Sequence, residues 1–169
     1  SGKITKAWNG GDIEATVDLS RYYSDSDEHG ILTGGIVGTN SRQDEEMNTG
    51  SISQIYNTGN IEATLINPNA RSLNYTGTGG IAGINAGVIS NAYSTGRVQD
   101  SISNAPDIIG GIIGNNFAGV QDENTFNGSI SQAVYANDIA GTAAAAIGQN
   151  TGTVSNVTGR TLAGMKQAA

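Results

Sequence analysis

The sequence predicts an all-β protein, a parallel β-helix (β-solenoid) of right-handed winding with about four to five coils and loop inserts. Three short phrases recur in a constant order along the 169 residues. Glycine occurs 25 times and proline twice, which suits a fold with many tight turns. Equivalent positions of successive phrases carry the same type of residue, as stacking of like on like requires.

The first phrase, called A, reads Gly-x-Ile/Val-Ser/Thr-polar-apolar and usually ends on an aromatic residue. Its alternation of apolar and polar side chains is typical of a short strand with one buried face. We expect its third position to stack inside the coil, at Ile4, Ile52, Ile89, Ile130 and Val154. The aromatic residues Trp8, Tyr56 and Tyr93 share a column, which we interpret as core or corner packing.

The second phrase, B, reads "NGGDIEA" from Asn9, "NTGNIEA" from Asn57 and "STGRVQD" from Ser94, with a degraded copy near Ala136. Its glycines mark a corner before a short strand. The third phrase, C, reads "GGIVGTN" from Gly34, with later copies at residues 79–85, 110–116 and, decayed, 144–150. One strand for each phrase gives three strands per coil.

Phrase C ends on an asparagine two residues after its last glycine in all four copies. Asparagine tolerates the left-handed backbone of a tight corner, and its amide can bond to the same amide one coil away. We therefore predict a structural column at Asn40, Asn85, Asn116 and Asn150.

The spacing of phrase A sets the organisation of the chain. Its copies begin near residues 2, 50, 87, 128 and 152, so the intervals are 48, 37, 41 and 24 residues. The shortest interval still holds all three phrases, so the others contain inserts. We expect a solenoid over residues 1–160 and a C-terminal tail over residues 161–169.

Composition excludes several classes of partner and chemistry. The net charge of −7 and the pI near 4.4 disfavour nucleic acid and anionic lipid. Cysteine is absent, so disulfides and thiolate chemistry are excluded. No apolar run reaches the ~18 residues that span a bilayer. We expect neither nucleic-acid binding nor membrane insertion.

The phrases together resemble a known family. The combination of the pattern "GxIxxAYxTGxI" with "GGIVGxNxG" is similar to the GLUG repeats of bacterial secreted and surface proteins, and "TLAGMKQ" from Thr161 is similar to the segment that closes such arrays. The resemblance implies large exported proteins, namely adhesins and the non-catalytic regions of IgA-cleaving metallopeptidases. It carries over no catalytic residue.

Candidate chemistry is sparse. The only histidine, His29, lies in "DSDEHG" without a partner motif, and Glu14 and Glu62 form a carboxylate column that Gln99 interrupts. Asp25 and Asp27 have part of a calcium-loop spacing, but Ile36 stands where the last acidic ligand belongs. We expect no enzymatic activity and no cofactor, with Ca²⁺ at Asp25 and Asp27 as a weak alternative.

The inserts are the remaining candidates for ligand contact, because loops on rigid scaffolds often bear function. Two acidic inserts should leave the same corner, one with Asp44, Glu45 and Glu46 and the other with Asp122 and Glu123. Other inserts carry Tyr22, Tyr23 and Tyr75. These residues are either contact loops or a solvated, packed edge of the coil.

We therefore expect a non-catalytic structural and interaction module, a rigid piece of a larger adhesin-like protein that is secreted or held at a bacterial surface. Its partners would be a host surface protein or glycan and neighbouring domains of the same protein. A carbohydrate-active β-solenoid enzyme and an accessory region of a secreted peptidase are the alternatives.

Overall fold

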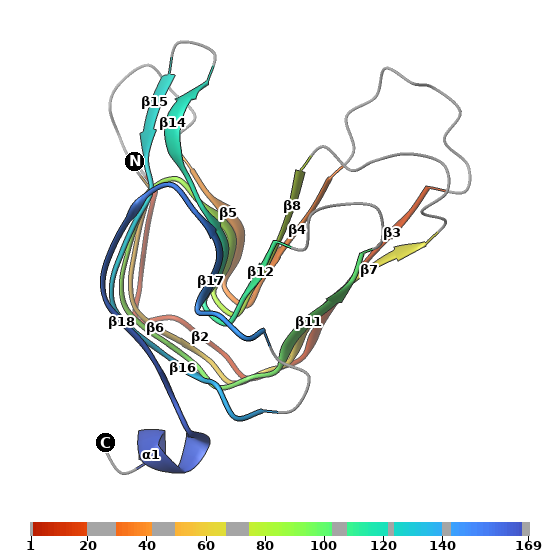
Figure 1. Cartoon of the computed structure of the whole chain (residues 1–169), viewed down its shortest axis with the longest axis vertical. Helices are drawn as coiled ribbons and strands as arrows, with labels where there is room; N and C mark the ends of the chain where they lie inside the picture. Colours follow the sequence, from red (N-terminus) through yellow and green to blue (C-terminus); the bar gives the residue numbers. More distant parts are fainter. Residues whose placement is uncertain are drawn as a thin grey trace.

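The computed structural model describes residues 2–19, 30–41, 50–66, 75–102, 108–121, 124–139 and 143–166. In this part the chain is all-β, with four parallel sheets, one antiparallel hairpin and one short helix. Each parallel sheet takes its strands from several successive repeats, and its strand order follows the order of the repeats. Figure 1 looks along the direction in which these strands stack.

The strands fall into sets that we name sheets A to D. Sheet A contains β1 (Lys3–Thr5), β2 (Trp8–Asn9), β6 (Ser51–Asn57), β10 (Val88–Ser94), β16 (Ser129–Ala136) and β18 (Thr153–Arg160). Sheet B contains β3 (Ile13–Asp18), β7 (Ile61–Ile66) and β11 (Val98–Ser101). Sheet C contains β4 (Gly30–Gly34), β8 (Tyr75–Gly79) and β12 (Ile109–Gly110). Sheet D contains β5 (Val37–Asn40), β9 (Ala82–Asn85), β13 (Ile113–Asn116) and β17 (Ile147–Asn150).

The strand register is the one that the phrases predict. In sheet A the third position of phrase A pairs with itself in all five copies, from Ile4 to Val154. In sheet B, Ile13 pairs with Ile61, which pairs with Val98. Even the decayed fourth copy of phrase C stays in register, because Ile147 pairs with Ile113.

The expectation of one strand for each phrase is wrong for phrase C. Its double glycine is a bend between two strands, so β8 ends at Gly79 and β9 begins at Ala82. A Cβ on Gly79 would overlap the carbonyl oxygen of Ala82, so only glycine fits this bend. A repeat therefore has four strands, and the additional one belongs to sheet C.

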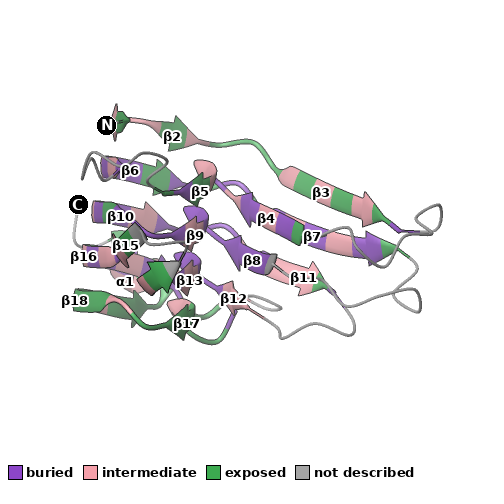
Figure 2. Cartoon of the chain, turned by 90° about the horizontal axis from the view of Figure 1, so that it is seen from above, coloured by how far each residue is buried: buried purple, intermediate pink, exposed green. Residues whose placement is uncertain are grey.

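The core has two parts. Sheets A and D enclose the larger part, which includes Ile52, Ile89 and Ile113, and sheets B and C enclose a smaller one around Ile31 and Leu65 (Figure 1). Burial is deepest in the middle repeats and declines toward both ends of the stack (Figure 2). Val154 was expected inside but is 42% exposed, because β18 is the last strand of sheet A and has a neighbour on one side only.

Every copy of phrase A contains one residue with left-handed backbone. These residues have φ between 51° and 56° and are Lys6, Gln54, Asn91, Gln132 and Asn156. Each interrupts the simple alternation of the strand, so Ile52 and Ile55 both point inward although they are three residues apart. The last two residues of the phrase then resume an alternation of opposite phase.

The last described element is helix α1 (Leu162–Lys166), within the segment expected as a C-terminal tail. The backbone N–H of Leu162 donates to Oδ1 of Asp138 at 2.7 Å, and Met165 is buried. No helix in the described residues is long and apolar enough to cross a membrane.

Candidate functional site

The four asparagines that end phrase C lie in one column at the corner between sheets D and A. Nδ2 of Asn40 donates to Oδ1 of Asn85 at 2.7 Å, Asn85 donates to Asn116 at 2.8 Å, and Asn116 donates to Asn150 at 2.8 Å. The column thus has one hydrogen-bond direction, from each repeat to the next. Its first three members are buried, so these amides bond where water does not compete.

Three of the four corners are also closed by a bond from the asparagine to a glycine carbonyl. Nδ2 of Asn85 donates to the carbonyl oxygen of Gly87 at 3.2 Å, and Asn150 donates to that of Gly152 at 3.3 Å. The same pair of groups closes the corner that carries the insert of residues 41–49, because Asn40 donates to the carbonyl of Gly50 at 3.5 Å.

A second asparagine column lies at the corner between sheets A and B and was missed by the sequence interpretation. Nδ2 of Asn9 donates to Oδ1 of Asn57 at 2.8 Å, and Asn57 donates to the carbonyl of Gly59 at 2.8 Å. The signal was present, since both residues begin the same Asn-x-Gly triplet. The column stops at Ser94, whose buried hydroxyl oxygen has no hydrogen-bond partner.

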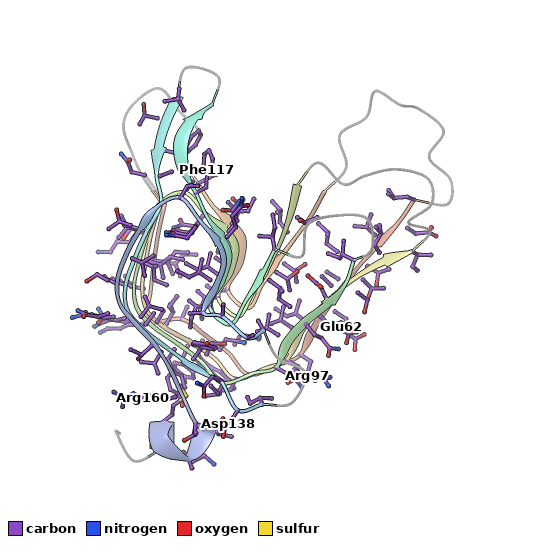
Figure 3. All side chains as sticks on the ribbon, in the orientation of Figure 1. Glu62, Arg97, Phe117, Asp138 and Arg160 are labelled. Carbon is purple, nitrogen blue, oxygen red and sulfur yellow. The ribbon has the colours of Figure 1, made fainter. Side chains whose placement is uncertain are left out.

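The second acidic insert leaves the first column as an antiparallel hairpin of β14 (Ala118–Gln121) and β15 (Asn124–Asn127). Gly128 N donates to Phe117 O at 2.8 Å and closes the neck of this hairpin, while the Phe117 and Phe126 rings lie 5.7 Å apart. Figures 1 and 3 show the hairpin rising from the corner near Phe117. The acidic pair Asp122 and Glu123, which separates these two strands in the sequence, lies outside the described residues.

Most of the loop residues that were candidates for ligand contact also lie outside the described residues. These are Tyr22, Tyr23, Asp25, Asp27, Asp44, Glu45 and Glu46. Tyr75 is the first residue of β8, and the surroundings of its side chain are not described. In the described part of the chain, no three His, Cys, Asp or Glu side chains form a group that could hold a metal ion.

The outer face of sheet A carries columns of similar residues from successive repeats. It presents a hydroxyl column, Thr5, Ser53, Ser90, Ser131 and Ser155, whose members pair in register. Beside it runs the exposed column of the five left-handed residues, four of which carry a side-chain amide.

The outer face of sheet A also carries an aromatic column that includes Trp8 and Tyr56. The interpretation of these two residues as core or corner packing is therefore wrong. Trp8 pairs with Tyr56, which pairs with Tyr93, and the first two are 63% and 43% exposed. Their rings are stacked, with centroids 5.8 Å apart and planes 9° from parallel. The column continues as Val134 and Thr158, so it is aromatic only toward the first repeats.

The predicted carboxylate column lies on the outer face of sheet B. Glu14 pairs with Glu62, which pairs with Gln99, and the neighbouring Ala63 faces the core instead. Figure 3 places Glu62 and Arg97 on the side of sheet B that faces away from sheet C. In the described part of the chain this column therefore ends after two carboxylates.

No family model, no curated protein and no solved structure matches this chain. The interpretation of the site therefore rests on the geometry given above.

Proposed function

We propose that the chain is a right-handed parallel β-solenoid that serves as a rigid, non-catalytic segment of a bacterial adhesin-like protein, secreted or held at the cell surface. The order of strands in sheets A, B and D supports the winding, because each sheet takes successive repeats in turn. The right hand follows from the strong preference of parallel crossovers. The similarity of the phrases to GLUG repeats supports the cellular setting.

The observation that carries this proposal is the uninterrupted asparagine column. Three consecutive amide bonds of 2.7 to 2.8 Å link four repeats at one corner, and the first three asparagines of the column are buried. Parallel strands add backbone bonds between the same repeats. Neighbouring repeats can therefore tilt or slide only by breaking several bonds together, which suits a spacer that holds a ligand surface away from its anchor.

The outer face of sheet A supports a glycan as the ligand. A sugar ring has an apolar face that packs on an aromatic ring and hydroxyls that bond to amides and hydroxyls. Trp8 and Tyr56 offer the exposed aromatic platform, and the polar columns run beside it. Tyrosine, serine and asparagine are also the residues with which antibody loops build adaptable contact surfaces.

The test is titration of the intact chain with neutral oligosaccharides, using calorimetry for binding and mass spectrometry for cleavage. We expect binding without cleavage, and a loss of at least about tenfold in affinity for Trp8→Ala combined with Tyr56→Ala, since one aromatic contact contributes about 0.5–1.5 kcal/mol. Val120→Ala, at a residue of β14 that is 71% exposed, is the matched control and should bind as wild type.

Three other results of this titration would contradict parts of the proposal. Cleavage of any oligosaccharide, with loss of turnover in Glu62→Gln, would favour a carbohydrate-active enzyme over the non-catalytic module. Equal affinity of the wild type and the aromatic double variant would move the ligand contact away from sheet A. No binding to a broad glycan panel would overturn the glycan assignment.

A further inference from the structure

Charged residues are segregated between sheets A and B. The strands of sheet B contain four acidic residues and no basic one, namely Glu14, Asp18, Glu62 and Asp100. The strands of sheet A contain no aspartate or glutamate, and their only charged residues are Lys3 and Arg160. Sheet A therefore presents positive charge alone, although the whole chain has a net charge of −7.

Two lysines lie on the outer face of sheet A in the first repeat. Lys3 pairs with Ser51 next to the hydroxyl column, and its side chain is exposed. Lys6 is also exposed and belongs to the column of left-handed residues. Its backbone N–H donates to Ser53 O at 3.2 Å, which holds it against the second repeat. Both lysines are thus on the face that carries Trp8.

The spacing of Lys6 and Trp8 distinguishes the first repeat from the next two. Lys6 precedes Trp8 by two residues, which places them at most about 7 Å apart along the strand. At the equivalent places an amide precedes the aromatic residue, namely Gln54 before Tyr56 and Asn91 before Tyr93. Only the first repeat thus combines the aromatic residue with a cation, whereas the others offer neutral hydrogen-bonding groups.

We propose that the glycan bound on sheet A is acidic, and that Lys3 and Lys6 bind the carboxylate of a uronic acid whose ring packs on Trp8. This assignment rests on the proposed glycan binding and adds the class of sugar. A carboxylate on a ring at Trp8 lies within reach of the flexible four-carbon side chain of Lys6. Complementary charge selects such a ligand over a neutral one, and no carboxylate of the sheet A strands repels it.

Trp8 is the only tryptophan of the chain, so its fluorescence reports binding at this place. The experiment titrates the intact chain with trigalacturonate and with its trimethyl ester, which has the same rings and hydroxyls but no charge. In low salt we expect the acid to bind at least about fivefold more tightly than the ester, as two exposed ion pairs would give. Raising NaCl from about 0.05 M to about 0.5 M should remove most of this preference, because salt screens exposed charges.

Lys3→Ser combined with Lys6→Gln removes both charges and copies residues that the second repeat carries at the same positions. Ser51 and Gln54 occupy these positions, and Gln54 has the same φ of 56° as Lys6, so the fold should stay intact. The double variant should bind the acid at least about fivefold more weakly and the ester as wild type. Lys166→Gln removes an exposed charge from α1 and is the matched control, which should leave both affinities unchanged.

Equal affinity for acid and ester, or an affinity for the acid that the double lysine variant does not change, would overturn the acidic assignment and leave the proposed glycan binding in place. A triglutamate peptide that binds as tightly as trigalacturonate would show that the face recognises charge alone, which would also overturn it. If neither sugar changes the fluorescence of Trp8 and no neutral oligosaccharide binds, the glycan function fails together with this inference.

Discussion

Replacing Asn85 by alanine tests the asparagine column at its centre. The side chain is fully buried and bonds to Asn40 at 2.7 Å and to Asn116 at 2.8 Å. It also donates to the carbonyls of Gly87 and Ser129, at 3.2 and 3.1 Å. Alanine removes all of these bonds and leaves their partners in place.

The expected magnitude follows from the groups left behind. The substitution leaves one amide donor, on Asn40, and one oxygen acceptor, on Asn116, without their best partners. Each unsatisfied buried group costs about 1–3 kcal/mol, so we expect a loss of about 3–4 kcal/mol in the free energy of unfolding. At about 2–4 °C per kcal/mol for a chain of this size, Tm should fall by about 10 °C.

The matched control is Asn150→Ala at the exposed end of the same column. Asn150 accepts one bond from Asn116 and donates to Gly152, where water can replace it, so we expect a loss of about 1 kcal/mol. Urea titrations followed by circular dichroism measure both, with equal m-values as the check that the compared states are alike.

A second variant separates the amide from the side-chain volume. Asn85→Asp keeps the shape and the acceptor oxygens but cannot donate to Oδ1 of Asn116, and it buries a charge. It should be at least as destabilising as Asn85→Ala. If Asn85→Ala costs no more than Asn150→Ala, the buried column does not hold the repeats together and the argument for a rigid module fails.

Three further predictions concern the same stack and use the same urea titration. Ser94→Asn should raise the free energy of unfolding by about 1 kcal/mol, because it replaces an unpaired hydroxyl by an amide. The new amide can accept from Asn57 and donate to the carbonyl of Gly96. A loss of stability would contradict this extension of the second column. Gly96→Ala should lower the free energy of unfolding by more than about 2 kcal/mol, because a methyl group there would overlap a backbone carbonyl of the neighbouring repeat. Gly2→Ala is the control and should be neutral, because Gly2 lies in open space. Ile89→Ala, at a fully buried position, should lower the free energy of unfolding by about 2–5 kcal/mol. A smaller effect would mean that sheet A does not cover a packed core.

Columns of identical residues could be predicted because parallel stacking places equivalent positions of each repeat in direct contact. Ile52, Ile89 and Ile130 share one environment, so the same side chain suits all three and the pattern is visible in the sequence. Asn85 and Asn116 are predictable for the same reason, because an amide in such a column bonds best to another amide.

Two features were missed for equally physical reasons. The strands of sheet C have no recurring phrase, as "GILTG" at Gly30–Gly34 and "YTGTG" at Tyr75–Gly79 share little beyond Thr-Gly. The exposure of Tyr56 was missed because simple alternation from Ile52 places it inside, whereas the left-handed Gln54 reverses the phase. A glutamine in a sequence does not by itself indicate a positive φ. Only a comparison of all five copies of phrase A could have suggested a left-handed residue at this position.

The corner geometry explains how inserts of such different length coexist with a regular stack. Where no insert occurs, Asn85 and Gly87 close the corner directly; where residues 41–49 intervene, Asn40 still bonds to the carbonyl of Gly50. The insert therefore begins and ends at two points that the stack already fixes, as the neck of the β14–β15 hairpin also does. Because the cost of closing a loop grows only slowly with its length, this corner can vary in loop sequence and size without changing the stacking of the repeats. The loops of a repeat can then change while its stacking stays the same, which is what the proposed presenting module requires.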